Sequence, residues 1–372
     1  MPDSGDYRIY KPRLERCQKL MLEKDIDLLF LGPGPNMCYL SGFLEEPSER
    51  LLSLIVPQSG DPLFIVPELY EQQVRSSSWI KSISSWKDSQ DPKIVLSKTM
   101  RQILTKHPTI AVDGRMWSHF LLMLLSVAPD VQYGDAASVM TELRIRKTSQ
   151  EIELLEKSAE IADAALLETL NECRQGTSEH QIAAKIVYEL RRLGADGIAF
   201  EPVASSGPNA ALPHYRSGER KLEKGDLLVL DFGCLYRGYN SDITRTVAIG
   251  KCDVEKEKVY SIVRSAQEET CQRALQGMEA QSVDGIARTI IEAAGYGQFF
   301  IHRTGHGIGL EIHEEPYIVA GNSDKLAQGM AFSVEPGIYI HGQYGVRIED
   351  IVVMEDERAR RLNKSSRELV IL

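Results

Sequence analysis

The sequence predicts a two-domain α+β protein, with a smaller N-terminal α/β domain over residues 1–145 and a larger domain over residues 146–372. The length of 372 residues favours more than one domain, since a domain takes about 150 residues. Near residue 145 the chain changes from short, mixed strand and helix patterns to a long helical pattern. The second half then repeats its own pattern at an interval of 104 residues, which indicates a duplicated α+β unit packed around a pseudo-twofold axis.

In the N-terminal domain, apolar runs alternate with turn residues. Residues 51–57 and 63–67 are two such runs, and the turn composition of residues 58–62 between them predicts a β-hairpin. Further elements are expected as helices over residues 12–24 and 118–127 and as strands over residues 26–31 and 109–112. This mixture is typical of a small α/β domain.

The larger domain opens with the strongest helical periodicity of the chain, over residues 149–174. Further along, residues 221–233 match residues 325–337, and Ser178 matches Ser282 at the same interval. Each copy is therefore expected to contain two helices and a strand that ends in a carboxylate.

Four acidic residues occupy equivalent places in the two copies. Asp231 ends an apolar strand, and Asp242 follows a turn, so a hairpin would bring the two side chains together. Glu335 and Glu349 repeat this arrangement. A single acid of this kind is ordinarily a solvated surface group, but the duplication favours a common site. Four converging carboxylates would repel one another strongly unless cations neutralise them.

Three of the eight histidines fall between His302 and His313. The central one, His306, has a glycine on either side, which leaves space for a metal ion or a substrate. Imidazole with carboxylates suits Mn, Co or Zn. One histidine and four carboxylates exceed the needs of one tetrahedral zinc ion, and they fit two divalent ions about 3.5 Å apart.

Composition limits the remaining possibilities. Lys and Arg number 43 against 53 Asp and Glu, and the net charge of −10 disfavours a nucleic-acid partner. No apolar run approaches the roughly 18 residues of a membrane span, so no membrane partner is expected. The six cysteines are scattered and the N-terminus lacks a secretory pattern, from which we expect reduced thiols and a cytoplasmic protein.

The acidic and histidine residues lie in five distinctive segments, Val229–Gly233, Ser241–Thr246, His302–Pro316, Ser333–Tyr339 and Gly345–Asp350. These segments resemble motifs of the Xaa-Pro peptidases, prolidase and aminopeptidase P, which share the pita-bread fold with methionine aminopeptidase. The N-terminal half resembles the creatinase-type domain of this family more weakly, chiefly through residues 36–43.

The resemblance implies metal-dependent hydrolysis of the bond before proline in small proline-containing peptides, and it implies a homodimer. The metal ligands that it implies are Asp231, Asp242, His306, Glu335 and Glu349. The catalytic residues that it implies are His214, His313, Glu335 and Arg347, with His302 and Tyr339 binding or orienting the substrate. Two rivals, a metal-free creatinase-like amidinohydrolase and a non-catalytic binding module, are disfavoured because all five ligand positions are intact.

The choice between dipeptidase and aminopeptidase depends on how the substrate ends. A dipeptidase must bind a free carboxylate one residue beyond the scissile bond, which calls for a fixed cation such as arginine. Prolidases similar to this chain usually carry that arginine where Tyr317 stands here. Arg216 is an alternative cation, and we predict an Xaa-Pro dipeptidase, with aminopeptidase P as the alternative.

Overall fold

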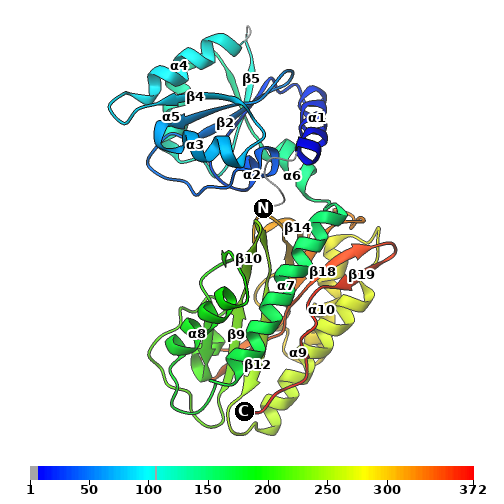
Figure 1. The fold of residues 1–372 in the computed structure, drawn as a ribbon. Helices are drawn as coiled ribbons and strands as arrows, with labels where there is room; N and C mark the ends of the chain where they lie inside the picture. Colours follow the sequence, from blue (N-terminus) through cyan, green and yellow to red (C-terminus); the bar gives the residue numbers. More distant parts are fainter. Residues whose placement is uncertain (1–6, 105–106) are drawn as a thin grey trace. The chain divides into compact units, whose positions relative to one another are not determined.

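The computed structural model describes residues 7–104 and 107–372. The chain forms two compact units, Met1–Arg144 and Ile145–Leu372, and both can be followed in Figure 1. Each unit is described separately below. Within the described residues, no helix combines the length and the apolar character that a membrane crossing requires.

A six-stranded mixed sheet in the order β4-β3-β2-β1-β5-β6 forms the centre of the N-terminal unit. Its strands are β1 (Leu28–Leu31), β2 (Ser53–Pro57), β3 (Leu63–Pro67), β4 (Ser82–Trp86), β5 (Thr109–Val112) and β6 (Gln132–Asp135). Its helices are α1 (Tyr7–Glu23), α2 (Pro35–Ser41), α3 (Glu68–Ser77), α4 (Pro92–Ile103), α5 (Ser118–Val127) and α6 (Ala137–Arg144). Strand β1 is fully buried, which explains its uninterrupted run of apolar residues.

Most expectations for this unit are confirmed. Strands β2 and β3 pair antiparallel as the predicted hairpin, and α5 covers the predicted helix. The sequence did not predict α2, which begins at Pro35, directly after the turn that ends β1. Proline suits the first position of a helix because its missing N–H would have no partner there.

Four long helices and thirteen strands make up the described C-terminal unit. The helices are α7 (Ser149–Leu170), α8 (Glu179–Arg192), α9 (Val254–Arg273) and α10 (Ala280–Ala293). The strands of its first half are β7 (Gly197–Ile198), β8 (Val203–Ser206), β9 (Leu227–Phe232), β10 (Cys234–Tyr236), β11 (Tyr239–Asn240) and β12 (Ile243–Ala248). The strands of its second half are β13 (Gly305–Gly307), β14 (Glu314–Ile318), β15 (Ala331–Val334), β16 (Gly337–Ile340), β17 (Tyr344–Arg347), β18 (Asp350–Glu355) and β19 (Arg358–Arg361).

The two halves of this unit repeat one another, which confirms the predicted duplication. Strand β15 begins 104 residues after β9, at residue 331 against residue 227. Strand β18 pairs with β15, just as β12 pairs with β9. Both strand pairs are antiparallel. Helices α9 and α10 likewise repeat α7 and α8.

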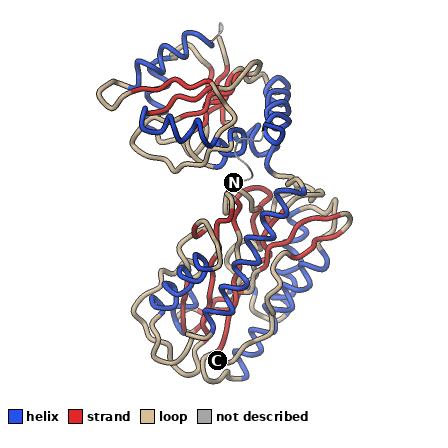
Figure 2. Tube along the Cα trace, in the orientation of Figure 1, coloured by secondary structure: helices blue, strands red, loops and turns tan. Residues whose placement is uncertain are grey.

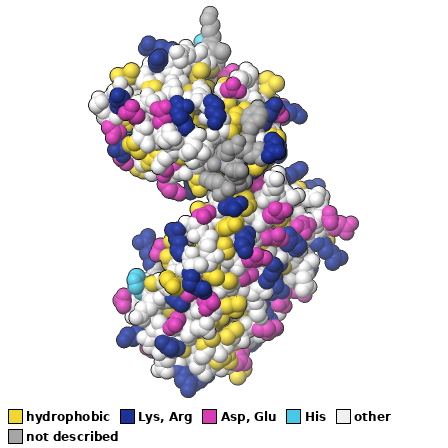
Figure 3. Space-filling model, viewed as in Figure 1, with side chains coloured by type: hydrophobic (Ala, Val, Ile, Leu, Met, Phe, Trp, Pro, Cys, Tyr) yellow, Lys and Arg dark blue, Asp and Glu magenta, His cyan; other side chains and the backbone are white. Residues whose placement is uncertain are grey.

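Helices pack along the strands in both halves, as Figure 2 shows. In the first half, Ile182, Ile186 and Leu190 of α8 share a buried core with Leu228 and Leu230 of β9. Apolar residues of α9 and α10 form a second core with β17 and neighbouring strands. This packing fixes the strand ends that carry the acidic residues. On the face drawn in Figure 3, basic and acidic side chains are interspersed over the surface.

Candidate active site

The first pair of carboxylates lies where β9 and β12 meet. Asp231 is near the end of β9 and pairs across the sheet with Thr244 of β12. Asp242 directly precedes β12, so the antiparallel register brings it next to Asp231, as the sequence predicts. Leu227–Leu230 are buried, and the strand therefore presents its acid at the edge of an apolar core.

The second half contributes Glu335 and Glu349 from the equivalent strand ends. Glu335 follows β15, and its N–H donates to the carbonyl oxygen of Thr304 at 2.8 Å. Glu349 precedes β18, and its Oε2 accepts a hydrogen bond from Thr244 Oγ1 at 2.7 Å. The N–H of Glu349 also donates to the Thr244 carbonyl oxygen at 3.0 Å. Thr244 therefore links the two halves of the unit at the site.

His306 in β13 completes the cluster. Its Nε2 lies 3.7 Å from Asp242 Oδ2 and 3.4 Å from Glu335 Oε1. Its Nδ1 lies 3.0 Å from the carbonyl oxygen of Gly307, so the proton belongs on Nδ1 and the lone pair of Nε2 faces the carboxylates. A Cβ at Gly305 would overlap the carbonyl oxygen of Ser333, and only glycine lets β13 approach β15 this closely.

The arrangement fits divalent cations. Three carboxylate oxygens are buried and have no hydrogen-bond partner among the described residues: Oδ1 of Asp231, Oδ1 of Asp242 and Oε1 of Glu349. One ligand atom each from Asp242, His306 and Glu349 lies within 4.8 Å of the others. Buried anionic oxygens without partners are costly, and hard or borderline cations bind to such oxygens and to imidazole.

The pKa values of the cluster residues in the protein without metal also favour a bound cation. Burial and then the neighbouring carboxylates raise the pKa values of Asp242 and Glu349 well above their usual range. Burial also raises the pKa of Glu335 to about 7. Burial lowers the pKa of His306 to about 3, which keeps the ring in the neutral form that binds metals.

A chain of hydrogen bonds through Arg347 and Tyr339 orients Asp231. Arg347 Nη2 donates to Asp231 Oδ2 at 2.5 Å, and Arg347 Nη1 donates to the Tyr339 hydroxyl at 2.8 Å. That hydroxyl lies 2.9 Å from His302 Nε2. Burial lowers the pKa of His302 to about 4, so the neutral ring accepts the Tyr339 proton. These hydrogen bonds fix the orientation of the Asp231 carboxylate.

A pocket of about 620 Å³ opens in front of the cluster. The predicted residues His214 and Arg216 line it from the exposed loop after η1 (Gly207–Ala211), and His313 lines another side. The His313 ring lies 4.1 Å from the His306 ring, centre to centre. The structure thus brings the predicted site residues together around one pocket, with Tyr339 joined to them through Arg347 and His302.

Sequence reasoning missed three contributors. Thr244 lies two residues after Asp242, and Arg303 lies next to His302 inside the histidine motif, where it also lines the pocket. Arg245 was missed as well. Its Nη1 donates to the carbonyl oxygen of Glu349 at 2.6 Å, and its Nη2 donates to Asp350 Oδ1 at 2.6 Å.

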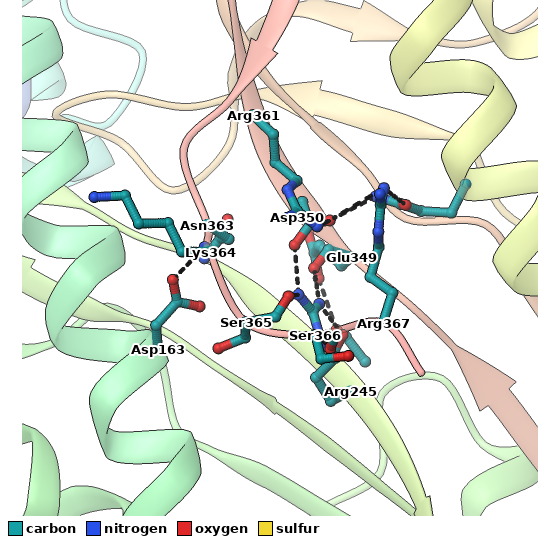
Figure 4. Close-up of polar contacts among 12 residues, drawn as sticks. Asp163, Arg245, Glu349, Asp350, Arg361, Asn363, Lys364, Ser365, Ser366 and Arg367 are labelled. Atoms are coloured by element: carbon teal, nitrogen blue, oxygen red, sulfur yellow. Dashed lines mark hydrogen bonds and ion pairs between the residues drawn. The ribbon is translucent and has the colours of Figure 1, made fainter. Parts of the chain in front are cut away.

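Figure 4 shows how this network also fixes the C-terminal segment. Arg245 donates to the carbonyl oxygens of Ser365 and Ser366, at 3.1 and 2.8 Å. Asp350 accepts a further hydrogen bond from Gln267 Nε2 at 3.0 Å. The backbone that carries Glu349 is therefore held by the buried ion pair of Arg245 and Asp350.

Comparison with known proteins agrees with this geometry. A model of metallopeptidase family M24 matches residues 153–356, which include all five expected metal ligands. The chain belongs to metallopeptidase family M24. A model of the creatinase/prolidase N-terminal domain matches residues 13–146. The predicted pairing of a creatinase-type domain with a pita-bread domain is thereby confirmed, and the protein is a metallopeptidase of a divalent-metal family.

Relatives of this M24 protein are similar over nearly its whole length. An Xaa-Pro dipeptidase of Pyrococcus furiosus is 37% identical, with 97% of this chain and 100% of the relative covered. The crystal structure of prolidase from Thermococcus sibiricus has a TM-score of 0.95 at 39% identity, covering 98% of this chain and 99% of that one. An X-Pro aminopeptidase structure from Thermotoga maritima has a TM-score of 0.87 at 33% identity, covering 96% and 99%.

Proposed function

We propose that this protein is an Xaa-Pro dipeptidase that uses two divalent metal ions. The observation that carries the proposal is the cluster of carboxylates that lines a pocket of about 620 Å³. Three of its buried oxygens have no hydrogen-bond partner in the described part of the chain. Relatives that match nearly the whole chain are named Xaa-Pro dipeptidase or prolidase, which supports the substrate class.

The cluster residues would hold the two ions, with Mn as the expected metal and Co or Zn as compatible ones. The proposed ligands are Asp231, Asp242, His306, Glu335 and Glu349. Bound ions of this kind polarise a carbonyl group and make water a better nucleophile at neutral pH.

The chain itself supplies orientation and proton transfer. His313 and His214 both line the pocket, where a ring N–H can donate to the oxygen of the scissile carbonyl as negative charge develops on it. Glu335 accepts from Ser333 Oγ at 3.2 Å and is placed to carry a proton to the leaving nitrogen. Arg347, with Tyr339 and His302, keeps Asp231 oriented.

The pocket also suits a proline ring. Phe200, Val203 and Ile312 give it apolar walls. Proline has a fixed φ and no N–H, so an apolar wall satisfies it and no backbone acceptor is required.

Aminopeptidase P activity is the second candidate. It is favoured by the similarity to the X-Pro aminopeptidase of Thermotoga maritima and by Tyr317, which stands where we expected a carboxylate-binding arginine. Arg216 is exposed at the pocket and is a proposed substrate-binding cation.

A comparison of Ala-Pro with Ala-Pro-Ala hydrolysis by the Mn-loaded protein separates the two candidates. We expect Ala-Pro to be cleaved with the higher kcat/KM. Efficient cleavage of the tripeptide with negligible turnover of the dipeptide would assign aminopeptidase P activity instead.

We further propose that the protein acts in the cytoplasm as a homodimer, with residues 1–145 as the creatinase-type domain and residues 146–372 as the catalytic domain. All six cysteines are free and five are buried, which agrees with a reducing compartment. Light scattering of the purified protein tests the dimer through its mass, which should be twice the 41.7 kDa of the chain.

A further inference from the structure

A dipeptide substrate, on which this inference rests, brings a free carboxylate into the pocket one residue beyond the scissile bond. The metal cluster is strongly acidic and cannot receive that group without bound ions. Among the described residues that line the pocket, the arginines are Arg216, Arg303 and Arg347. An arginine that binds a substrate carboxylate needs free N–H donors and a fixed position.

Arg347 is already engaged. Its guanidinium donates to Asp231, to the Tyr339 hydroxyl and, through Nε, to Thr244 Oγ1 at 3.2 Å. It is also buried, with 4% of its surface exposed. Its role is to orient Asp231, and a substrate carboxylate would have to compete with that bond.

Arg216 differs from Arg347 because its side chain is exposed and unsupported. It lies on an exposed loop, and the described residues offer its guanidinium no hydrogen bond, ion pair or ring contact. A long, unsupported side chain loses rotamer entropy when it binds, which reduces its net contribution.

Arg303 combines free donors with a fixed position. Its guanidinium carbon lies 4.4 Å from the centre of the Tyr317 ring, within the range of a cation–π contact. The side chain is half-buried, and no acceptor in the described part of the chain takes a hydrogen bond from it. Stacking leaves the N–H groups at the edge of the guanidinium plane available for bidentate binding of a carboxylate.

The backbone on both sides of this contact is well anchored. The N–H of Thr304, next to Arg303, donates to the carbonyl oxygen of Ile318, next to Tyr317, at 3.0 Å. The carbonyl oxygen of Tyr317 accepts from Asn322 Nδ2 at 2.8 Å. The two side chains therefore lie on adjacent, hydrogen-bonded segments.

The position of Arg303 relative to the reacting groups is also appropriate. Arg303 lines the same pocket as His306 and His313. It can therefore reach a substrate that contacts both rings.

We propose that Arg303 binds the C-terminal carboxylate of the Xaa-Pro dipeptide and that Tyr317, as a positioning residue, holds the guanidinium in place. Tyr317, which departs from the arginine expected at this position, thus becomes part of the same carboxylate site. The cation comes from the segment before β13, and the ring that supports it comes from β14.

Matched substrates isolate the carboxylate. Kinetics on Ala-Pro and on its C-terminal amide, with the Mn-loaded protein, compare a charged group with a neutral one. We expect Arg303→Ala to raise KM for Ala-Pro by about tenfold or more, as for loss of a bidentate ion pair. The kcat/KM for the amide should change by less than about threefold, because the amide makes no ion pair.

Further variants distinguish this role from a structural one. Tyr317→Ala should raise KM for Ala-Pro, and Tyr317→Phe, which keeps the ring, should restore it. The double change Arg303→Ser with Tyr317→Arg moves the cation to β14 and should regain selectivity for Ala-Pro over its amide. Arg273→Ala, at the exposed end of α9, removes the same charge away from the pocket and serves as the control.

Two outcomes would overturn the proposal. Equal losses on Ala-Pro and its amide in Arg303→Ala, with unchanged thermal melting, would show that Arg303 does not recognise the carboxylate. A larger selective loss in Arg216→Ala would assign the carboxylate to Arg216. Either result leaves the proposed function intact, whereas an unmutated protein that cleaves no Xaa-Pro peptide would contradict that function itself.

Discussion

At the scale of the residue, the expected metal ligands differ in how the protein holds them. Asp231 is oriented by Arg347, and Glu349 is oriented by Thr244. Among the described residues, Asp242 Oδ1 has no hydrogen-bond partner. A ligand whose second oxygen is hydrogen-bonded keeps its geometry when the metal leaves, and such supporting contacts tune metal affinity.

Glu349→Gln should abolish the recovery of activity when Mn or Co is added to chelated protein. The amide keeps the shape of the side chain but lacks the charge that a hard cation requires. Metal content and activity after Mn addition measure the effect, and Asp231→Asn should behave in the same way. Glu357→Gln, on an exposed turn, is the matched control. Full recovery in Glu349→Gln would contradict its role as a ligand.

The two neighbouring histidines should respond differently to substitution. His313→Ala should lower kcat by about 100-fold or more with normal metal content, as for loss of a donor to a developing oxyanion. His306→Ala should lose metal instead, because Nε2 of His306 faces the carboxylates. Metal analysis beside kinetics separates the roles, and equal metal loss in both variants would refute this division.

At the scale of the element, the buried ion pair of Arg245 and Asp350 fixes the backbone of Glu349. Arg245 and Asp350 are 3% and 0% exposed, and their bond joins β12 to β18. The same arginine holds the C-terminal segment through two carbonyl oxygens. Removal of Arg245 takes the shortest ion pair from the buried Asp350, which keeps only longer pairs with Arg361 and Arg367, at 3.3 and 3.8 Å. It also takes a donor from the carbonyl oxygen of Glu349.

Arg245→Met should therefore lower the free energy of unfolding by about 3–5 kcal/mol. Urea denaturation of the Mn-loaded protein measures this change. Lys157→Met, which breaks an exposed pair with Glu160, is the control and should cost less than about 1 kcal/mol. Similar losses of unfolding free energy in both variants would show that the Arg245–Asp350 pair stabilises the protein no more than an exposed pair does.

Elements with strong periodicity were predictable from the sequence. Helix α7 follows from its apolar spacing and from the capping box of Thr148 and Glu151. It ends at Leu170, earlier than the expected residue 174. Short elements such as α2 were missed, because seven residues after a turn carry little periodic signal.

Only part of the site could likewise be predicted from the sequence. The acidic ligands were predictable because two copies place acids at equivalent strand ends. Arg303 was missed because an arginine beside a motif is ordinarily a solvated charge. Only the folded strands bring it over Tyr317, fourteen residues later.

At the scale of the whole molecule, metal binding should be coupled to stability and pH. Without metal, the raised pKa of Glu335, about 7, and those of Asp242 and Glu349 make the folded state bind more protons than the unfolded state. This excess begins above the usual carboxyl pKa of about 4. The contribution of these groups to stability is therefore present at low pH and is lost as pH rises through the folded pKa values.

We expect the increase in melting temperature on adding Mn to be larger at pH 7.5 than at pH 5. At higher pH the empty cluster is less stable, and the ligands are deprotonated and bind metal more tightly. Differential scanning calorimetry at the two pH values measures the melting temperature with and without Mn. An Asp242→Asn, Glu335→Gln double variant should lose most of the difference. An equal increase at both pH values in the unmutated protein would contradict this coupling.

The most direct test of the central claim is proline release from Ala-Pro as a function of bound metal per chain. Chelated protein is titrated with Mn, and its metal content is measured on the same samples as its activity. The dinuclear Xaa-Pro dipeptidase predicts no activity without metal and a maximum near two ions per chain, which is the number that five ligands of this kind hold. Full Ala-Pro hydrolysis by metal-free protein, or none at any Mn content, would contradict the account.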